Sequence, residues 1–313
     1  MGLDARDSRR PLIPMTLGWG VGLALVTALV SGVSIFVNAY AVRQLPDAAV
    51  YTTLKNAVAA AILVGAAALV VRRVELRALD RRAWAGLAVV GIVGGSVPFL
   101  LFFAGLAEAS APSAAFIHKT LFVWVALLAV PLLGERLGWL QVAALGVLLG
   151  GQLLVTPPTG VRWGTGETMI AAATLLWAAE AVLVRRLLAV VPSPVLAGGR
   201  LGVGMIVLVG YLVASGRIGV LGGLSAEAWA WVAVTGVLLA GYVGTWYAAL
   251  RRAPAAIVTS LLVVGAPITA VLQGIASGAA PAAPAVGGYV LVASAVVAVA
   301  ATTLRGRALR TVR

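Results

Sequence analysis

Two segments of this chain, 145 residues apart, share most of their sequence. Residues 83–91 read AWAGLAVVG and residues 228–236 read AWAWVAVTG, so six of the nine positions are identical. Lys55 and Arg200 lie at the same 145-residue spacing within apolar surroundings. A chance match between two Ala- and Val-rich stretches is the alternative, but the paired charges argue against it. The repeat therefore predicts a fold built from two related halves.

The composition excludes a soluble globular protein. Of the 313 residues, 62% are hydrophobic and 11% are charged, and the mean hydropathy is +1.06. A soluble domain of this size needs far more polar surface. The apolar stretches recur at about 20 residues, the length that crosses a hydrocarbon core of about 30 Å as a helix. We therefore expect an all-α membrane protein rather than a barrel, whose strands would alternate in polarity over about ten residues.

Ten transmembrane helices are predicted, five in each half. The breaks between them fall where Pro, Gly and charged residues collect, and every predicted loop is short. Residues 17–156 form the first five-helix repeat and residues 165–304 the second, while residues 1–16 and 305–313 are cytoplasmic tails. The predicted helices comprise residues 17–41, 49–71, 84–106, 112–133, 137–156, 165–187, 195–215, 228–250, 254–275 and 284–304.

The positive charges predict the orientation of these helices. Of the 23 Lys and Arg residues, 17 fall in loops and tails on one side of the membrane, three on the other side and three inside predicted helices. The positive-inside rule places the cation-rich side, with both termini, in the cytoplasm. Because each half has an odd number of helices, the second half enters the membrane upside down. The two halves thus form an inverted repeat, an arrangement that supports alternating access in transporters.

Several function classes are excluded by what the sequence lacks. The net charge of +13 comes from cations at the ends of apolar stretches, so there is no basic domain for nucleic acid. The chain has no Cys and no Walker-type phosphate loop, which excludes thiolate metal sites and direct use of ATP. An intramembrane enzyme would need a nucleophile–base set, paired acids or a metal cluster, and the sequence has none. We therefore expect no enzymatic activity, no metal and no cofactor.

A turn motif links this pattern to a known family. Pro131, Gly134 and Glu135 form a Pro-x-x-Gly-Glu turn after the fourth predicted helix. Together with ten helices in two halves, this turn resembles the drug/metabolite transporter superfamily in its bacterial EamA-type branch. Within that branch the Ala- and Gly-rich chain is most similar to amino-acid exporters. In the second half the matching turn reads SGA at residues 277–279, so the acid is missing there.

The resemblance implies a central cavity for a small-molecule substrate. The first four helices of each half line this cavity, and helices 137–156 and 284–304 are peripheral. The resemblance also implies a multi-pass protein of the bacterial inner (plasma) membrane, in contact with the lipid bilayer. We expect a monomer or a homodimer.

Five titratable residues lie inside predicted helices, where a charge costs several kcal/mol unless it faces a wet cavity or a partner. At about 1.5 Å per residue, Lys119 and Glu180 are roughly 5 Å from the midplane on opposite sides, and Lys55 and Arg200 are roughly 8 Å from it. Snorkelling to the interface is the alternative for Lys55 and Arg200. A hydrogen-bonded structural role is the alternative for His118. We predict that all five line the cavity and bind substrate.

Glu180 is the one acid within the apolar part of a predicted helix. It is expected to bind a substrate ammonium or to carry protons, and the alternative is a salt bridge with Arg200 or Arg186. Trp177 lies three residues earlier on the same helix face and is expected to pack against the substrate. The predicted binding set is completed by Asn38 and Ser260.

The charges inside the membrane predict the chemistry of the substrate. Three cations stand against one acid when His118 is neutral. This surplus favours a ligand with an anionic group, and a free amino acid fits with its carboxylate near a cation and its ammonium near Glu180. Phosphorylated sugars or other anionic metabolites, which use the cations more fully, are the alternative.

Aromatic residues provide candidate walls or gates for the cavity. Ser96, Phe99 and Phe103 share one face of the third predicted helix, and Tyr242 and Trp246 share one face of the eighth. Aromatic residues near helix ends also form interfacial belts, and this alternative is the favoured one for Trp246.

Two prolines lie inside predicted helices. Proline removes an internal hydrogen bond and loosens the helix around it. Pro98 and Pro267 are therefore the predicted hinges, although such kinks also shape static bundles.

These observations favour a secondary transporter that exports small metabolites by alternating access around a central cavity. Amino acids are the favoured substrates, and protons are the candidate coupling ion through Glu180 or His118. A channel is the alternative from another class, although it would usually need symmetric subunits or rings of charge.

Overall fold

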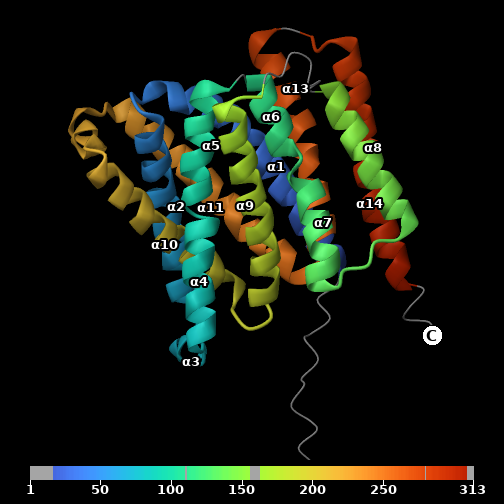
Figure 1. The fold of residues 1–313 in the computed structure, drawn as a ribbon, viewed down its shortest axis with the longest axis horizontal. Helices are drawn as coiled ribbons and strands as arrows, with labels where there is room; N and C mark the ends of the chain where they lie inside the picture. The colour runs from blue at the N-terminus through green and yellow to red at the C-terminus, as the bar shows by residue number, and fades with distance from the viewer. Residues whose placement is uncertain (1–16, 110, 156–162, 279, 309–313) are drawn as a thin grey trace, which may run out of the picture.

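The computed structural model describes residues 17–109, 111–155, 163–278 and 280–308, and the regular structure of this part is helical (Figure 1). Within it, nine helical spans are long and apolar enough to cross a membrane. A shorter apolar helix, α8 (Trp139–Val155), has 17 residues, which is the lower limit for crossing a bilayer. The predicted all-α membrane class is therefore confirmed, and the count of ten helices stays a prediction.

The helices follow the predicted segments in order along the chain. The first half contains α1 (Leu17–Ala41), η1 (Val42–Gln44), α2 (Ala48–Val70), α3 (Arg73–Arg77), α4 (Arg81–Val93), α5 (Val97–Glu108), α6 (Ala111–Lys119), α7 (Leu121–Leu133) and α8. The second half contains α9 (Thr165–Leu187), α10 (Ser193–Ala214), η2 (Arg217–Gly223), α11 (Ala226–Arg252), α12 (Ala255–Leu261), η3 (Leu262–Val264), α13 (Gly265–Ser277) and α14 (Ala283–Ala308).

The predicted bounds hold closely for seven of the ten segments. α1 and α9 begin and end at the predicted residues, and α2, α8, α10, α11 and α14 differ from prediction by one to four residues at each end. α14 continues to Ala308, past the predicted start of the C-terminal tail at residue 305, and the location of this tail stays a prediction. Residues 1–16, 156–162 and 309–313 lie outside the described residues, and so does the predicted N-terminal tail.

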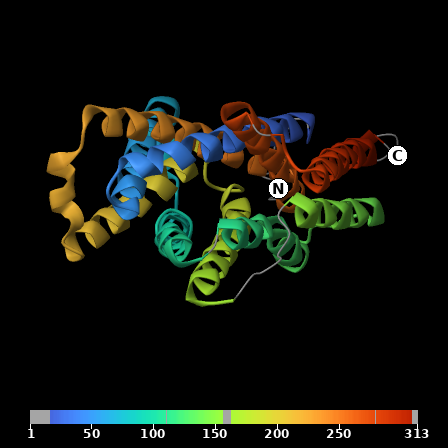
Figure 2. The same cartoon turned by 90° about the horizontal axis from the view of Figure 1, so that it is seen from above.

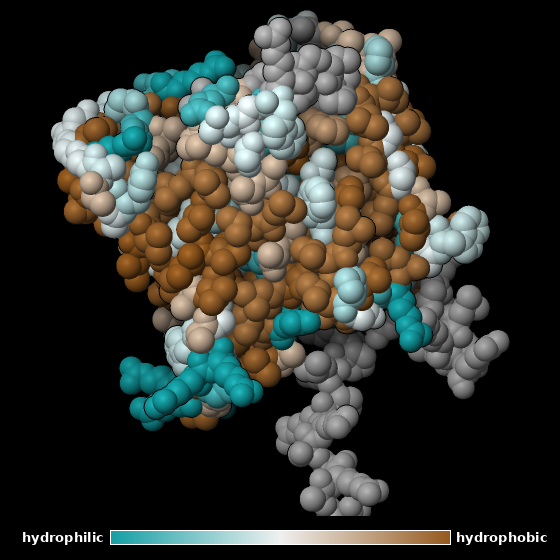
Figure 3. Space-filling model, in the orientation of Figure 1, coloured by the Kyte–Doolittle hydropathy of each residue, from teal (hydrophilic) through white to brown (hydrophobic). Residues whose placement is uncertain are grey.

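The two ends of the bundle are polar, and the surface between them is apolar. We call them the α3 end, where α1 begins and α14 ends, and the η2 end, which carries η1 and η2 (Figure 1). Hydrophobic residues cover the middle of the surface, and hydrophilic residues gather toward the ends (Figure 3). Five arginines are exposed at the α3 end, namely Arg72, Arg73, Arg77, Arg81 and Arg82.

The helices pack through small residues. α1 contacts α11 and α13, α2 contacts α10 and α11, and α5 contacts α9. α8 pairs with α14, and the two lie side by side at one side of the bundle (Figure 2). A Cβ atom built on Gly95 would lie 2.2 Å from the carbonyl oxygen of Arg200, so glycine is required where α4 and α10 meet. Close backbone approach of this kind drives helix association in lipid, where apolar surface alone gives little preference.

Three predicted transmembrane helices are discontinuous, which is the main departure from prediction. The segment 84–106 is divided into α4 and α5 by residues 94–96, 112–133 into α6 and α7 at Thr120, and 254–275 into α12 and α13 by η3. Position 265, which is 145 residues after Thr120, directly follows η3, so these two breaks occupy matching places in the two halves. The break between α4 and α5 has no counterpart at this spacing, because α11 is continuous.

The Pro-x-x-Gly-Glu turn joins the two halves at the α3 end. Gly134 ends α7 with a φ of 66°, a left-handed conformation that glycine adopts at no steric cost. The turn directs the Glu135 carboxylate to the first turn of α12. Its Oε1 accepts a hydrogen bond from the Ala255 N–H at 2.6 Å, and its Oε2 accepts one from the Ala256 N–H at 3.1 Å. Glu135 of the first half therefore caps a helix of the second half.

We expect Glu135→Ala to lower the thermal stability of the protein. The substitution leaves two backbone donors at the start of α12 without acceptors, and losing a helix cap costs about 0.5–2 kcal/mol. Thermal melting of the purified protein in detergent measures the effect as a fall in melting temperature. Glu75→Ala, an exposed acid on α3, is the matched control and should leave the melting temperature unchanged. Equal melting of the two variants would contradict the capping role.

Candidate functional site

Two adjoining cavities lie inside the bundle. The larger, of about 180 Å³, reaches Glu180 and Arg200, and the smaller, of about 60 Å³, reaches Lys119. Both are lined by residues from α1, α6, α7 and α11, so the two cavities are adjacent. We call the two together the central cavity. The residues lining both parts are Ser31, Ile35, His118, Leu121 and Tyr242.

The structure brings Glu180 and Arg200 together as an ion pair. The Arg200 Nε lies 3.6 Å from the Glu180 Oε1, and both side chains are almost fully buried. The Tyr247 hydroxyl donates a hydrogen bond to the same Oε1. The Glu180 Oε2 has no hydrogen-bond partner within the described residues. Two of the four predicted intramembrane charges therefore neutralise each other, while one carboxylate oxygen stays available.

Arg186, the other cation considered as a partner for Glu180, is bound elsewhere. Its guanidinium donates a hydrogen bond to the carbonyl of Leu132 at the end of α7. The ion pair links α9 with α10, and α4 packs against both of these helices.

The carbonyl of Gly94 holds this ion pair in place. In a regular helix this carbonyl would accept a hydrogen bond from the N–H four residues later, but that residue is Pro98, which has none. It accepts instead from the Arg200 Nη2 and from the Trp177 Nε1, each at 3.1 Å. Pro98 thus creates a backbone acceptor inside the membrane, of the kind that discontinuous helices supply in transporters.

Four aromatic rings form one wall of the cavity region. Trp177 lies with its ring centroid 5.3 Å from that of Phe99, 5.7 Å from Phe102 and 5.1 Å from His118, in edge-on or tilted arrangements. Phe102 and His118 are also 5.1 Å apart. The His118 Nδ1 is buried and has no hydrogen-bond partner among the described residues. Trp177, Phe99 and His118, which are all predicted site residues, line the larger part of the cavity.

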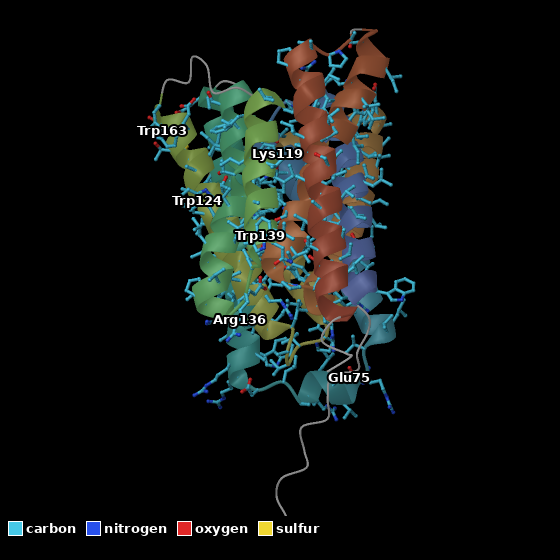
Figure 4. All side chains as sticks on the ribbon, turned by 90° about the vertical axis from the view of Figure 1, so that its right-hand side faces the viewer. Glu75, Lys119, Trp124, Arg136, Trp139 and Trp163 are labelled. Carbon is cyan, nitrogen blue, oxygen red and sulfur yellow. The ribbon has the colours of Figure 1, made fainter. Side chains whose placement is uncertain are left out.

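Lys119 is the unpaired cation of the central cavity. It is the last residue of α6, beside the helix break at Thr120, and it lines the smaller part of the cavity with Thr259 and Tyr242. Its ammonium forms no ion pair or hydrogen bond with the described residues. Figure 4 shows Lys119 within the span of the bundle, whereas Glu75 and Arg136 lie toward the α3 end and Trp163 lies at the other end.

Lys55 and Asn38 belong to a separate polar cluster between α1 and α2. The Lys55 Nζ donates to the Asn38 Oδ1 at 3.1 Å and lies 5.0 Å from the ring centroid of Tyr51 and 5.5 Å from that of Phe103. The Tyr51 hydroxyl donates to the same Asn38 oxygen. Lys55 is 6% exposed, so its charge is held inside the bundle and does not snorkel to an interface. None of these four residues lines the central cavity.

The predicted gate residues divide into two groups. Tyr242 and Trp246 line the central cavity with their rings stacked at an interplanar angle of 10°. Trp246 is 3% exposed, so the interfacial-belt alternative for it is wrong. Ser96 is buried and donates to the carbonyls of Gly91 and Ile92.

Two further predicted residues do not line the central cavity. The Ser260 hydroxyl is buried and donates to the Ala256 carbonyl at 2.6 Å within its own helix. Pro267 lies in the first turn of α13, where the helix restarts after η3, and is absent from the cavity lining. Ser260 therefore has no contact with the cavity, and the hinge role of Pro267 stays a prediction.

Sequence reasoning missed several parts of the site. Tyr247 directly follows Trp246, and nothing in its position marked it as a partner of Glu180. The Gly94 carbonyl is a backbone group, and its sequence signal is Pro98 four residues later. Ser31 and Ser34 line the cavity, and two hydroxyls three residues apart in an apolar helix were a signal that could have found them.

Comparison with known proteins agrees with this architecture. Residues 18–156, which run from α1 to just past α8, match the model of the EamA-like transporter family. This match covers the first half of the chain and confirms its predicted resemblance to the family, which lies within the drug/metabolite transporter superfamily. Together with the apolar helical spans, the match indicates a multi-pass membrane transporter of small solutes.

Solved structures share the fold. One of them, described as "Crystal structure of protein", superposes with a TM-score of 0.74 over 91% of this chain and 98% of the other, at 18% sequence identity. A comparison with curated protein sequences finds no match. The structural likeness establishes the fold and leaves the substrate to the chemistry of the cavity.

We expect Glu180→Gln and Arg200→Gln to destabilise the protein more as single variants than as a pair. Removing one partner leaves the other charge buried, which costs about 3–5 kcal/mol, whereas removing both leaves no charge. Thermal melting of the two single variants, the double variant and the exposed control Glu227→Gln measures this coupling. A double variant that melts at the temperature expected from simple addition would show that the two side chains do not stabilise each other.

Proposed function

We propose that this transporter is a secondary exporter of amino acids in the bacterial inner membrane. In this proposal it works by alternating access around the central cavity and has both termini in the cytoplasm. The observation that carries the proposal is the unpaired Lys119 ammonium, which faces the same cavity as the neutralised Glu180–Arg200 pair.

The charges of the cavity support a zwitterionic substrate. Because Glu180 and Arg200 offset each other, Lys119 is the uncompensated cation and a natural partner for one carboxylate. The Glu180 Oε2 is available to an ammonium group at the other end of the cavity. A free amino acid carries one group of each kind.

The size of the cavity supports a small substrate. Drug-sized ligands usually occupy pockets of roughly 300–1,000 Å³. The two parts of the central cavity measure about 180 and 60 Å³, which suits a solute smaller than a drug. The aromatic wall around Trp177 offers apolar contact for an amino-acid side chain.

The charged α3 end of the bundle supports the proposed orientation, and the helix breaks support the proposed mechanism. The exposed arginines of the α3 end favour a cytoplasmic location for that end under the positive-inside rule. The matching breaks in α6–α7 and α12–α13 support two related halves that exchange conformations.

Phosphorylated metabolites fit the cavity less well than amino acids. A phosphate dianion favours two or more free cations, and the pairing of Arg200 with Glu180 leaves Lys119 as the free one in the cavity. No observation in the described part of the chain favours a channel.

We expect Lys119→Ala to raise the KM for amino-acid export at least tenfold. The substitution removes a charge-assisted hydrogen bond to the substrate carboxylate, which is worth about 1.5–3 kcal/mol, and 1.4 kcal/mol corresponds to about a tenfold change. Proteoliposomes loaded with labelled amino acids measure the flux. Lys119→Arg keeps the charge and should stay within a few-fold of the unaltered protein.

Further arms of this experiment test the remaining parts of the proposal. Labelled sugar phosphates should show no saturable flux, and an imposed pH gradient should drive uphill movement if protons are coupled to transport. Unchanged flux in Lys119→Ala would remove Lys119 from the site. Saturable flux of sugar phosphates without flux of amino acids would overturn the proposed substrate.

A further inference from the structure

A second pocket lies beside the central cavity, toward the η2 end. It measures about 330 Å³ and is bounded by α2, α5, α10 and η2, and we call it the η2-end pocket. Phe99 lines both this pocket and the central cavity, so one aromatic ring stands between the two spaces. The residues lining it that matter below are Asp47, Thr52, Phe103, Tyr211 and Arg217.

The wall of this pocket contains a buried polar group without a partner. Thr52 is 1% exposed, and its hydroxyl has no hydrogen-bond partner among the described residues. This is unusual for a helical threonine, which normally donates to the carbonyl four residues earlier, as Thr53 does to Ala49 at 2.8 Å. A buried hydroxyl without a partner costs about 1–3 kcal/mol. A polar ligand in the pocket would supply the missing bond.

The mouth of the pocket holds one charge of each sign. The Arg217 Nη1 lies 3.2 Å from the Asp47 Oδ2, and the guanidinium lies 5.7 Å from the ring centroid of Tyr211. Asp47 is fixed by a second role, because its Oδ1 caps α2 by accepting from the N–H groups of Ala49 and Val50. The Arg217 side chain is 42% exposed, and an exposed pair of this kind is worth at most about 1 kcal/mol. Arg217 can therefore exchange Asp47 for another carboxylate at little cost.

We infer that the η2-end pocket is a second binding site for a zwitterionic amino acid. The substrate carboxylate binds the Arg217 guanidinium and accepts a hydrogen bond from the Thr52 hydroxyl. The substrate ammonium takes the place of Arg217 at the Asp47 Oδ2. This inference rests on the proposed function, since it assigns the same substrate a second position on its way out of the central cavity.

Phe99 and Phe103 set the boundary of this second site. Phe99 contacts Trp177 on the side of the central cavity, and Phe103 lies under the Lys55 ammonium. A solute that leaves the central cavity toward the η2 end meets these rings first and the Asp47–Arg217 pair afterwards.

The test is the number of amino acids bound per protein at equilibrium. Purified protein in nanodiscs is titrated with a radiolabelled amino acid identified by the flux assay, and bound label is counted by scintillation proximity. We expect two sites in the unaltered protein. Thr52→Val, which keeps the shape and removes the hydroxyl, and Arg217→Ala should each weaken the second site at least tenfold and leave the first unchanged.

Two control variants separate this site from the central one. Thr53→Val is the matched control, because Thr53 is the neighbouring threonine, already bonded within its own helix and absent from the pocket lining. It should leave both sites unchanged. Lys119→Ala should weaken the first site and leave the second.

The outcomes distinguish failure of the inference from failure of the proposed function. One site per protein, unaffected by Thr52→Val and Arg217→Ala, would overturn the second site and leave amino-acid export standing. Absence of binding for every amino acid would overturn both.

Discussion

The hydrocarbon core of the membrane offers no water, so every backbone N–H and C=O group inside it needs a partner from the protein. Side chains provide such partners at two irregular parts of the structure. Where Pro98 leaves the Gly94 carbonyl without its usual donor, Arg200 and Trp177 supply two donors from other helices. Where α12 begins, Glu135 accepts from two N–H groups. Side chains from distant parts of the chain are thereby tied to fixed backbone positions.

The same requirement positions the polar groups of the site. Arg200 is held from two directions, by the Gly94 carbonyl and by Glu180, and Glu180 is held in addition by Tyr247. This network leaves one carboxylate oxygen free and cancels one positive charge. Lys119, which lies outside the network, then sets the charge that a substrate meets. The cavity thus differs from the one that counting charges along the sequence predicts, where three cations oppose one acid.

The positions of the helices could be predicted from the sequence because bilayer thickness fixes the length of each apolar segment. The same regularity predicts the depths of Glu180 and Lys119 in the membrane. The sequence left Arg200 and Arg186 open as partners of Glu180, because a sequence gives neither the rotation of a helix about its axis nor its neighbours in space. Glu135 illustrates this limit: its motif is plain in the sequence, but the groups it caps lie 120 residues later. Tyr247 was missed for the same reason.

The Glu135 cap also makes the two ends of the bundle differ in the free energy that is needed to open them. Gly278 ends α13 with a φ of 66°, as Gly134 ends α7, but the sequence that follows it, Ala279–Ala280, provides no carboxylate. Under the proposed alternating access, opening the α3 end between α7 and α12 breaks a cap worth about 1 kcal/mol, and opening the η2 end breaks no equivalent bond at that turn. A difference of this size biases a two-state equilibrium roughly fivefold. The empty transporter then favours the state that is closed at the α3 end. A substrate that arrives from that side has to offset this difference with its binding free energy.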